Sequence, residues 1–134
     1  MNEELSYKNI SKIYKKLLPY IRKTPILETN NEIKKKFNTN LFLKLEFLQN
    51  AGTFKARGAI NNILNIKDSN IYGITAASAG NHAIAASYAA NKFNIKSKIF
   101  MYKSANKFRI KTVKSFTSNI IFSEPNEVFK KMNY

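Results

Sequence analysis

The first third of the chain combines a helical pattern with short extended segments. Apolar residues recur at three- and four-residue spacing after Ser6, a suitable N-cap, and predict a helix that Pro19 disturbs and Thr24-Pro25 ends. Its apolar positions are Ile10, Ile13, Tyr14, Leu17, Leu18 and Ile21. The pattern then predicts an extended piece, a helix and an apolar strand, at residues 26–27, 31–37 and 41–47.

Helices and strands alternate regularly in the rest of the chain. Gly52 marks a turn, and Thr53 is positioned to cap the helix that follows. The predicted elements are a helix at 54–66, a strand at 71–76, a helix at 81–93, a strand at 97–102, a helix at 106–116, a strand at 119–122 and a short helix at 126–132. Because crossover helices join parallel strands, this alternation predicts an α/β fold built on a parallel sheet with crossover helices.

Composition narrows the class of protein. The 134 residues, 44% of them hydrophobic, suit one domain with a packed core and exclude a wholly disordered chain. The chain has no cysteine, which excludes a disulfide scaffold and a thiolate metal site, and we expect no metal centre. The weakly polar stretch 71–90 is interrupted by Asn81-His82, so we expect no membrane span. The acidic start lacks the features of a signal peptide, and we expect a cytoplasmic protein.

The chain carries a net charge of +15, which is compatible with a nucleic-acid or anionic-membrane partner. The alternative is a compositional bias, because the basic residues are nearly all lysine and the chain is also rich in asparagine and isoleucine. Only Arg22, Arg57 and Arg109 carry the guanidinium fork that suits phosphates and base edges. The basic residues are also scattered, and we therefore expect no nucleic-acid partner and no membrane partner.

The segment 78–82, Ser-Ala-Gly-Asn-His, joins a predicted strand to a predicted helix. Its small residues keep the turn open, and the backbone N–H groups of a helix start can converge on a carboxylate or a phosphate. The alternative is an ordinary strand–helix connection with capping residues. These residues alone favour neither interpretation over the other.

Lys55 lies in the first turn of its predicted helix, beside Phe54. A helix N-terminus disfavours a positive charge by about 0.3–1 kcal/mol. Desolvation by Phe54 would act in the same direction. A neutral amine is what Schiff-base chemistry requires, so Lys55 is a candidate nucleophile. The alternative is a solvated surface lysine, which describes most lysines of the chain.

Two segments together resemble a known family. Lys44-Leu45-Glu46, followed by the run from Gln49 to Ala59, is similar to the cofactor-lysine motif of the fold-type II pyridoxal-phosphate enzymes. The segment 78–83 is similar to their asparagine loop, and residues 24–26, Thr-Pro-Ile, are similar to the motif that opens their catalytic core. The resemblance is strongest to the threonine dehydratase and serine racemase branch. It covers nearly the whole chain and makes Lys55 the leading catalytic candidate.

The resemblance implies a role for each of these residues. Lys55 would hold pyridoxal 5′-phosphate covalently and, once substrate displaces it, remove the Cα proton. Phe54 would pack against the cofactor ring, and Asn81 would hydrogen-bond the 3′ oxygen of the ring. The residues that would hold the substrate carboxylate are Ser78, Ala79, Gly80, Asn81 and His82. His82 would have a packing or hydrogen-bonding role rather than act as an acid or a base.

The implied activity is a threonine or serine dehydratase, an ammonia-lyase that converts L-threonine or L-serine to a 2-oxo acid and ammonia, in amino-acid metabolism such as isoleucine biosynthesis. His82 follows the asparagine where cysteine and threonine synthases typically have threonine. Ala79 occupies the position at which racemases carry a serine, whereas Ile84 departs from the glutamine usual in the family. The alternatives are a serine racemase, another fold-type II enzyme, or a non-catalytic remnant that serves as a binding module.

The same resemblance predicts parts of two domains. Residues 1–57 would form the N-terminal part of the larger, cofactor-holding domain, and residues 58–134 an incomplete smaller, mobile domain. In the family a glycine-rich phosphate-binding loop comes later in the chain, and nothing after Gly80 matches it. We therefore expect a truncated form that is inactive alone, leaves apolar residues such as Leu41, Leu43 and Phe47 uncovered, and forms a homo-oligomer when full length.

Overall fold

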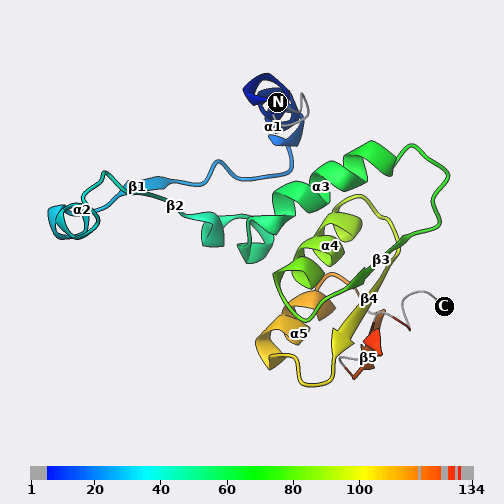
Figure 1. Ribbon diagram of the computed structural model, residues 1–134. Helices are drawn as coiled ribbons and strands as arrows, with labels where there is room; N and C mark the ends of the chain where they lie inside the picture. Colours follow the sequence, from blue (N-terminus) through cyan, green and yellow to red (C-terminus); the bar gives the residue numbers. More distant parts are fainter. Residues whose placement is uncertain (1–5, 118, 125–126, 129, 131–134) are drawn as a thin grey trace.

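The computed structural model describes residues 6–117, 119–124, 127–128 and 130. Its largest part is an α/β unit with a parallel sheet of strand order β3-β4-β5 (Figure 1). The strands are β3 (Ile74–Ala77), β4 (Ser97–Tyr102) and β5 (Ile120–Ser123), with Ala76 paired to Ile99 and Ile99 paired to Ile120. The helices α4 (Asn81–Lys92) and α5 (Lys107–Lys114) connect successive strands. This arrangement confirms the predicted α/β fold with a parallel sheet and crossover helices.

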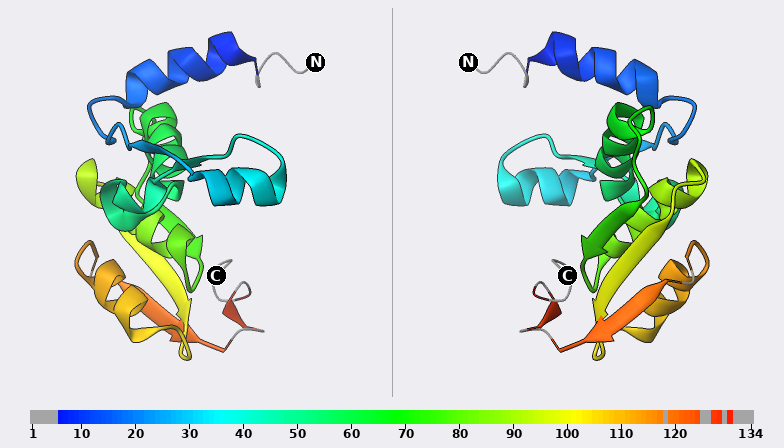
Figure 2. Two further views of the ribbon diagram at one scale, coloured as in Figure 1. Left: turned by 90° about the vertical axis from the view of Figure 1, so that its left-hand side faces the viewer. Right: turned by 90° about the vertical axis from the view of Figure 1, so that its right-hand side faces the viewer.

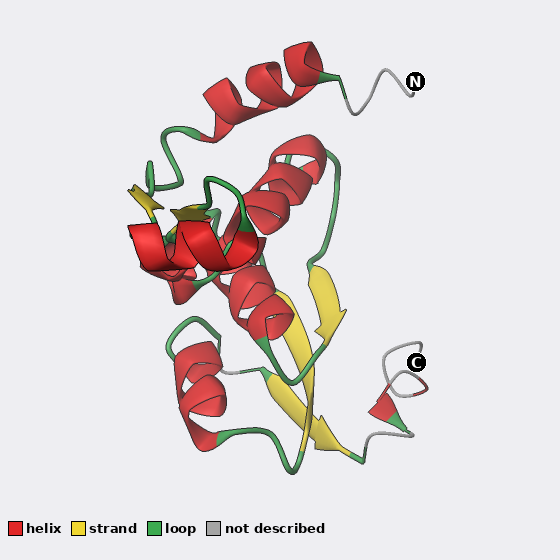
Figure 3. Ribbon diagram, turned by 60° about the vertical axis from the view of Figure 1, so that its left-hand side comes forward, coloured by secondary structure: helices red, strands yellow, loops and turns green. Residues whose placement is uncertain are grey.

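Both crossover helices lie on the same side of the sheet (Figure 3). Right-handed crossovers between strands in sequential order require this placement. The loops that follow β3 and β4 therefore meet at one edge of the sheet, where the carboxyl ends of the strands lie. Open α/β sheets bind their ligands at this edge.

The core of the α/β unit forms around α4, which is apolar on nearly every side. Its alanines at positions 83, 85, 86, 89 and 90 are all buried. Ser87 is also fully buried, and its hydroxyl donates to the carbonyls of Ala83 and Ile84 within the same helix, which satisfies the polar atom. On the sheet side, Ile84 packs with Ile99, Met101 and Val113. A helix of small residues lets its neighbours approach closely.

The two remaining helices pack against the other side of α4. The helix α3 (Lys55–Ile66) lies along α4, and its Ile60 and Ile63 share a core cluster with Leu17, Ile21 and Ala89. Leu17 ends α1 (Tyr7–Leu17), whose N-cap is the predicted Ser6. The predicted helix pattern continued to residue 21, but the helix stops at Leu17 because Pro19 follows.

A second substructure, the arm, consists of residues 25–48 and extends away from the α/β unit (Figures 1 and 2). Its strands β1 (Ile26–Glu28) and β2 (Phe42–Lys44) pair antiparallel, and α2 (Asn31–Phe37) lies between them in the chain. The prediction of a parallel sheet thus holds for the α/β unit but not for the arm. All residues of β1 and β2 are exposed.

Three predicted elements differ in their limits. The strand expected at 41–47 ends at Lys44, and the short 3-10 helices η2 (Glu46–Leu48) and η3 (Asn50–Gly52) follow, because Glu46 turns to pair with Arg57. The strand expected at 71–76 covers Ile74–Ala77 instead. Just before it, a side chain on Gly73 would lie 2.7 Å from the Lys96 carbonyl oxygen, so only glycine fits there without a shift of the backbone.

The predicted helix at 126–132 falls largely outside the described residues. Among the helices that the structure does describe, none has the length and apolar character needed to cross a membrane.

Candidate functional site

The segment 78–82 lies at the carboxyl end of β3, as the sequence predicts. The N–H of Ser78 donates to the Phe100 carbonyl at 2.9 Å, which continues the strand pairing by one residue. The Ser78 hydroxyl accepts the N–H of Gly80 at 3.2 Å, and α4 begins at Asn81. One of the N–H groups expected to be free for an anion is therefore used within the turn. The N–H groups of Asn81 and His82 have no acceptor inside the helix, as at any helix start.

Lys55 is the first residue of α3 and is exposed. Its N–H donates to the hydroxyl of Thr53, the predicted capping residue, at 3.3 Å. The Lys55 ammonium lies 5.3 Å from the centroid of the Phe54 ring. Phe54 itself is 57% exposed, so the expected desolvation of the Lys55 amine by Phe54 is not found in this chain.

The turn that leads into α3 has two consecutive left-handed residues. Ala51 and Gly52 both have φ of +63°, and Ala51 packs against the core cluster of the α/β unit. A left-handed alanine is strained, and packing on both sides of the turn holds it in place. This turn sets where the first residue of α3, and with it Lys55, is presented.

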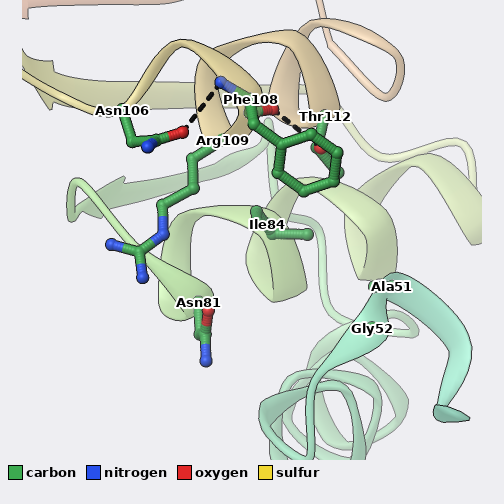
Figure 4. Close-up of a pocket in the computed structure, with 8 residues that line it drawn as sticks. All are labelled: Ala51, Gly52, Asn81, Ile84, Asn106, Phe108, Arg109 and Thr112. Carbon is green, nitrogen blue, oxygen red and sulfur yellow. Dashed lines mark hydrogen bonds between the residues drawn. The ribbon is translucent and has the colours of Figure 1, made fainter. Parts of the chain in front are cut away.

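A cavity of about 640 Å³ lies between this turn and the two crossover helices (Figure 4). Its lining residues are Ala51, Gly52, Asn81, Ile84, Asn106, Phe108, Arg109 and Thr112. Of the predicted site residues only Asn81 lines it. Lys55 and Phe54 follow Gly52 closely in the chain but remain outside the lining. The structure thus brings Asn81 next to the turn that leads into Lys55.

His82 lies apart from Asn81 although the two are neighbours in the chain. It lines a different cavity, of about 260 Å³, together with residues of α3 and α4 that include Asn62 and Ala86. Successive helical residues point about 100° apart, which accounts for this separation. The geometry is consistent with the packing role expected of His82.

A network of polar contacts joins the three resembling segments at one point. Arg57 donates from Nε and Nη2 to the two carboxylate oxygens of Glu46, each at 2.8 Å. The hydroxyl of Thr24 also donates to Glu46, and the Lys44 ammonium donates to the Thr24 carbonyl and hydroxyl at 2.9 and 2.7 Å. Arg57 follows Lys55 by two residues, so the network holds the start of α3 against the base of the arm.

These contacts change the pKa values of both partners. The paired Arg57 guanidinium lowers the pKa of the Glu46 carboxyl to about 2, with Thr24 and Lys44 acting in the same direction and burial opposing them. The Glu46 carboxylate in turn raises the pKa of Arg57. The sequence analysis used Glu46 and Arg57 only as parts of motifs and assigned them no role. A lysine–glutamate pair two residues apart, followed by a helix-start arginine, is the signal that was available.

Arg109 is a second residue to which the sequence analysis gave no role at the site. It belongs to α5, and its side chain extends toward the start of α4 and Asn81 (Figure 4). A side chain carbon built on Gly80 would lie 3.5 Å from Nη1 of Arg109, so the guanidinium rests against the backbone of the asparagine loop. Within the described residues, no group of three or more histidine, aspartate or glutamate side chains could hold a metal ion.

Comparison with known proteins identifies what the chain is similar to. A family model described as "Pyridoxal-phosphate dependent enzyme" matches residues 17–132. A biosynthetic L-threonine dehydratase of Staphylococcus epidermidis is 40% identical over 115 residues, which are 84% of this chain and 27% of the relative. A phenylserine dehydratase of Ralstonia pickettii is 36% identical over 110 residues, 81% of this chain and 33% of the relative. A serine racemase of Arabidopsis thaliana is 35% identical over 117 residues, 87% and 35% of the two chains.

Solved structures show the same fold. A pyridoxal 5′-phosphate-dependent aspartate racemase superposes with a TM-score of 0.86 at 25% identity, over 97% of this chain and 42% of that protein. A serine racemase from Dictyostelium discoideum superposes with a TM-score of 0.82 at 28% identity, over 94% and 41%. A bacterial-type threonine deaminase superposes with a TM-score of 0.81 at 25% identity, over 96% and 41%. The chain spans about a quarter to a third of the length of the curated relatives it matches.

Proposed function

Because the chain belongs to the fold-type II family of pyridoxal-phosphate-dependent enzymes, we propose that it supplies the lysine and asparagine part of the active site of a threonine or serine dehydratase. One observation carries this proposal. The turn that leads into Lys55 and the first residue of α4, Asn81, line one cavity at the carboxyl edge of the parallel sheet. Ligands of α/β proteins bind at this edge.

The groups around the cavity fit pyridoxal 5′-phosphate, the cofactor of this family. Its aldehyde requires an accessible primary amine, and Lys55 presents one at the exposed start of α3. Its ring oxygen requires a hydrogen-bond donor, and the Asn81 amide faces the cavity. The exposed Phe54 ring beside the Lys55 ammonium offers an apolar surface for the cofactor ring. When bound, the cofactor supplies an electron sink.

In this proposal the chain's own residues hold and orient the reactants. The Lys55 amine holds the cofactor and then takes the Cα proton of the substrate at Nζ. The loop 78–82 orients the substrate carboxylate. Ala79 carries no hydroxyl that could return a proton to the opposite face of the substrate, which favours loss of the β-hydroxyl over racemisation.

We also propose that residues 1–57 and 58–134 are parts of two domains, and that activity requires the polypeptide that corresponds to the rest of the relatives. The exposed strands of the arm support this, because Leu43 and Phe47 are 42% and 68% exposed. In the chain alone Lys55 is open to water, so we expect pyridoxal phosphate to bind weakly and without preference for Lys55. We also expect poor solubility, because uncovered apolar strands favour aggregation. A Lys55-dependent cofactor absorbance with steady 2-oxo acid production from the 134-residue chain would contradict the requirement.

Lys55 can be tested in the complete enzyme, whether a longer chain or a second polypeptide completes it. Borohydride reduction and peptide mapping should place the cofactor on Lys55. Lys55→Ala should abolish release of 2-oxo acid from L-threonine, whereas Lys67→Ala, at the other end of α3, should leave it unchanged. Cofactor attached to another lysine, or to none, would overturn the proposal and favour a non-catalytic binding module.

Ala79 tests the choice between dehydratase and racemase. The complete enzyme should form pyruvate from L-serine much faster than it forms D-serine, as followed by chiral chromatography. Ala79→Ser should raise the proportion of racemisation. Racemisation as fast as pyruvate formation in the unchanged enzyme would refute the dehydratase assignment.

A further inference from the structure

The guanidinium of Arg109 faces the proposed substrate cavity without a partner of opposite charge. It lines the cavity with Asn81, and its Nη1 and Cζ atoms lie 3.5 and 3.9 Å from a side chain carbon built on Gly80. In the part of the chain that the structure describes, no carboxylate forms an ion pair with Arg109. By contrast, Arg57 is fully engaged with Glu46.

The surroundings hold Arg109 in this position. The α5 helix is capped by the Asn106 side chain, which accepts the N–H of Phe108 at 2.9 Å, and the Thr112 hydroxyl donates to the Phe108 carbonyl one turn later. Val113 anchors the same helix in the core, where it is completely buried. The backbone that carries Arg109 is therefore rigid, and the guanidinium is presented at the loop 78–82.

The loop itself has fewer donors than its sequence suggests. The Gly80 N–H is already bound by the Ser78 hydroxyl. Ala79 contributes no side-chain donor. A carboxylate at this loop would be left with a small number of neutral N–H groups, while an arginine offers two parallel N–H donors together with a full positive charge.

We propose that Arg109 is a substrate-binding residue whose guanidinium pairs with the α-carboxylate of the amino acid seated at the loop 78–82. This inference rests on the proposed function, because it takes the ligand of the cavity to be an amino acid. It adds a charged group from α5 to a carboxylate site that the sequence assigned to the loop alone. Affinity for the substrate is then coupled to the position of α5 relative to α4.

The test compares two ligands that differ only in charge at the carboxyl group, on the complete enzyme freed of cofactor. L-threonine carries the carboxylate, and L-threoninamide replaces it with a neutral amide. Calorimetry should show that Arg109→Gln weakens binding of L-threonine by roughly ten- to a hundredfold, as expected for the loss of a charge-assisted contact. Binding of L-threoninamide should change less than about twofold. Arg109→Lys, which keeps the charge but not the fork, should restore part of the affinity.

Lys111→Gln is the matched control, since it removes the same charge from α5 at an exposed position outside the cavity. It should leave the affinity for both ligands unchanged. Equal weakening of both ligands by Arg109→Gln, no weakening of either, an effect of Lys111→Gln as large as that of Arg109→Gln, or no binding of L-threonine to the unchanged enzyme would overturn the inference.

The two proposals fail in different ways. Cofactor on Lys55 with threonine binding that is indifferent to Arg109 would contradict the role of Arg109 alone. A carboxylate-selective effect of Arg109→Gln without cofactor on Lys55 would contradict the dehydratase assignment alone. In the loaded enzyme, Arg109→Gln should raise KM for L-threonine more than it lowers kcat, because the contact is made in the ground state as well as in the transition state.

Discussion

The arm and the α/β unit contain similarly apolar strands, yet their exposure is opposite. In β4 the side chains of Ile99, Phe100 and Met101 are buried by α4 and the neighbouring strands. In β1 and β2 every residue is exposed, although the sequence there is Ile-Leu-Glu and Phe-Leu-Lys. The difference lies in what covers each sheet. An apolar strand pattern shows that burial is required, but the covering element can belong to another part of the protein.

The two regions meet at the Glu46–Arg57 pair. Glu46 closes the arm, and Arg57 belongs to the first turn of α3. A bidentate contact of this kind fixes orientation as well as distance. The arm is thus tied to the α/β unit at its base by a polar contact, while its strands remain uncovered.

The largest contrast is expected from truncating one apolar residue in each sheet. Ile99→Ala should lower the free energy of unfolding by about 2–5 kcal/mol, because it leaves a cavity in a closely packed core. Leu27→Ala, in the exposed strand β1, should change it by less than about 0.5 kcal/mol. Urea unfolding followed by circular dichroism at micromolar concentration measures both.

The same pair sharpens the comparison in the complete enzyme. If the rest of the protein covers the arm, Leu27→Ala should there become destabilising by amounts typical of a core. A large cost of Leu27→Ala in the 134-residue chain would show instead that the arm is already packed.

A smaller effect is expected at the contact between the two regions. Glu46→Gln should lower the free energy of unfolding at neutral pH by about 1–2 kcal/mol, because it removes a charge-assisted pair that still has some contact with water. Glu28→Gln, which breaks the more exposed pair with Lys34, should cost no more than about 0.5 kcal/mol.

The Glu46 contribution depends on pH in a defined direction. Its pKa is lowered from 4.5 to about 2 in the folded chain, so the folded state holds the proton less tightly than the unfolded state. The stabilisation is therefore complete above pH 4.5 and is lost as the pH falls toward 2. Glu46→Gln should remove this part of the pH dependence, and an unchanged acid profile would contradict the role of the pair.

The smallest contrast concerns two asparagine N-caps. Asn106 caps α5 in the α/β unit, and Asn30 caps α2 in the arm by accepting the N–H of Ile33 at 3.1 Å. Asn106→Ala should cost about 1 kcal/mol of global stability. Asn30→Ala should instead raise hydrogen exchange locally in α2 and leave global unfolding nearly unchanged, because little packing couples the arm to the core. Equal effects of the two variants on global unfolding would argue that the arm and the unit unfold together.

Local patterns were sufficient where the chain's own neighbours decide the structure. The bounds of α2 and β4 agree with those predicted from residues 31–37 and 97–102. The predicted caps Ser6 and Thr53 both accept backbone N–H groups. Each of these elements depends on hydrophobic spacing or on a hydroxyl two or three residues away, and such information is contained in a short window of sequence.

Tertiary contacts account for what the sequence analysis missed. The strand predicted at 41–47 is broken because Glu46 pairs with a residue eleven positions later. Arg109 reaches the asparagine loop only because α5 packs beside α4. No local spacing encodes these approaches. The exposure of Lys55 and Phe54 likewise depends on which parts of the protein surround them.

The small side chains of α4 also act as a spacer with a set thickness. Ala86 and Ala89 lie on the side of α4 that faces α3, next to Ile63. The separation of two packed helices follows the size of the side chains between them. A larger residue at Ala89 would push the two helix axes apart along their length, although it is about two turns away from Asn81. The gap between the proposed cofactor lysine and the proposed cofactor amide is therefore gauged by a single methyl group in the middle of a helix.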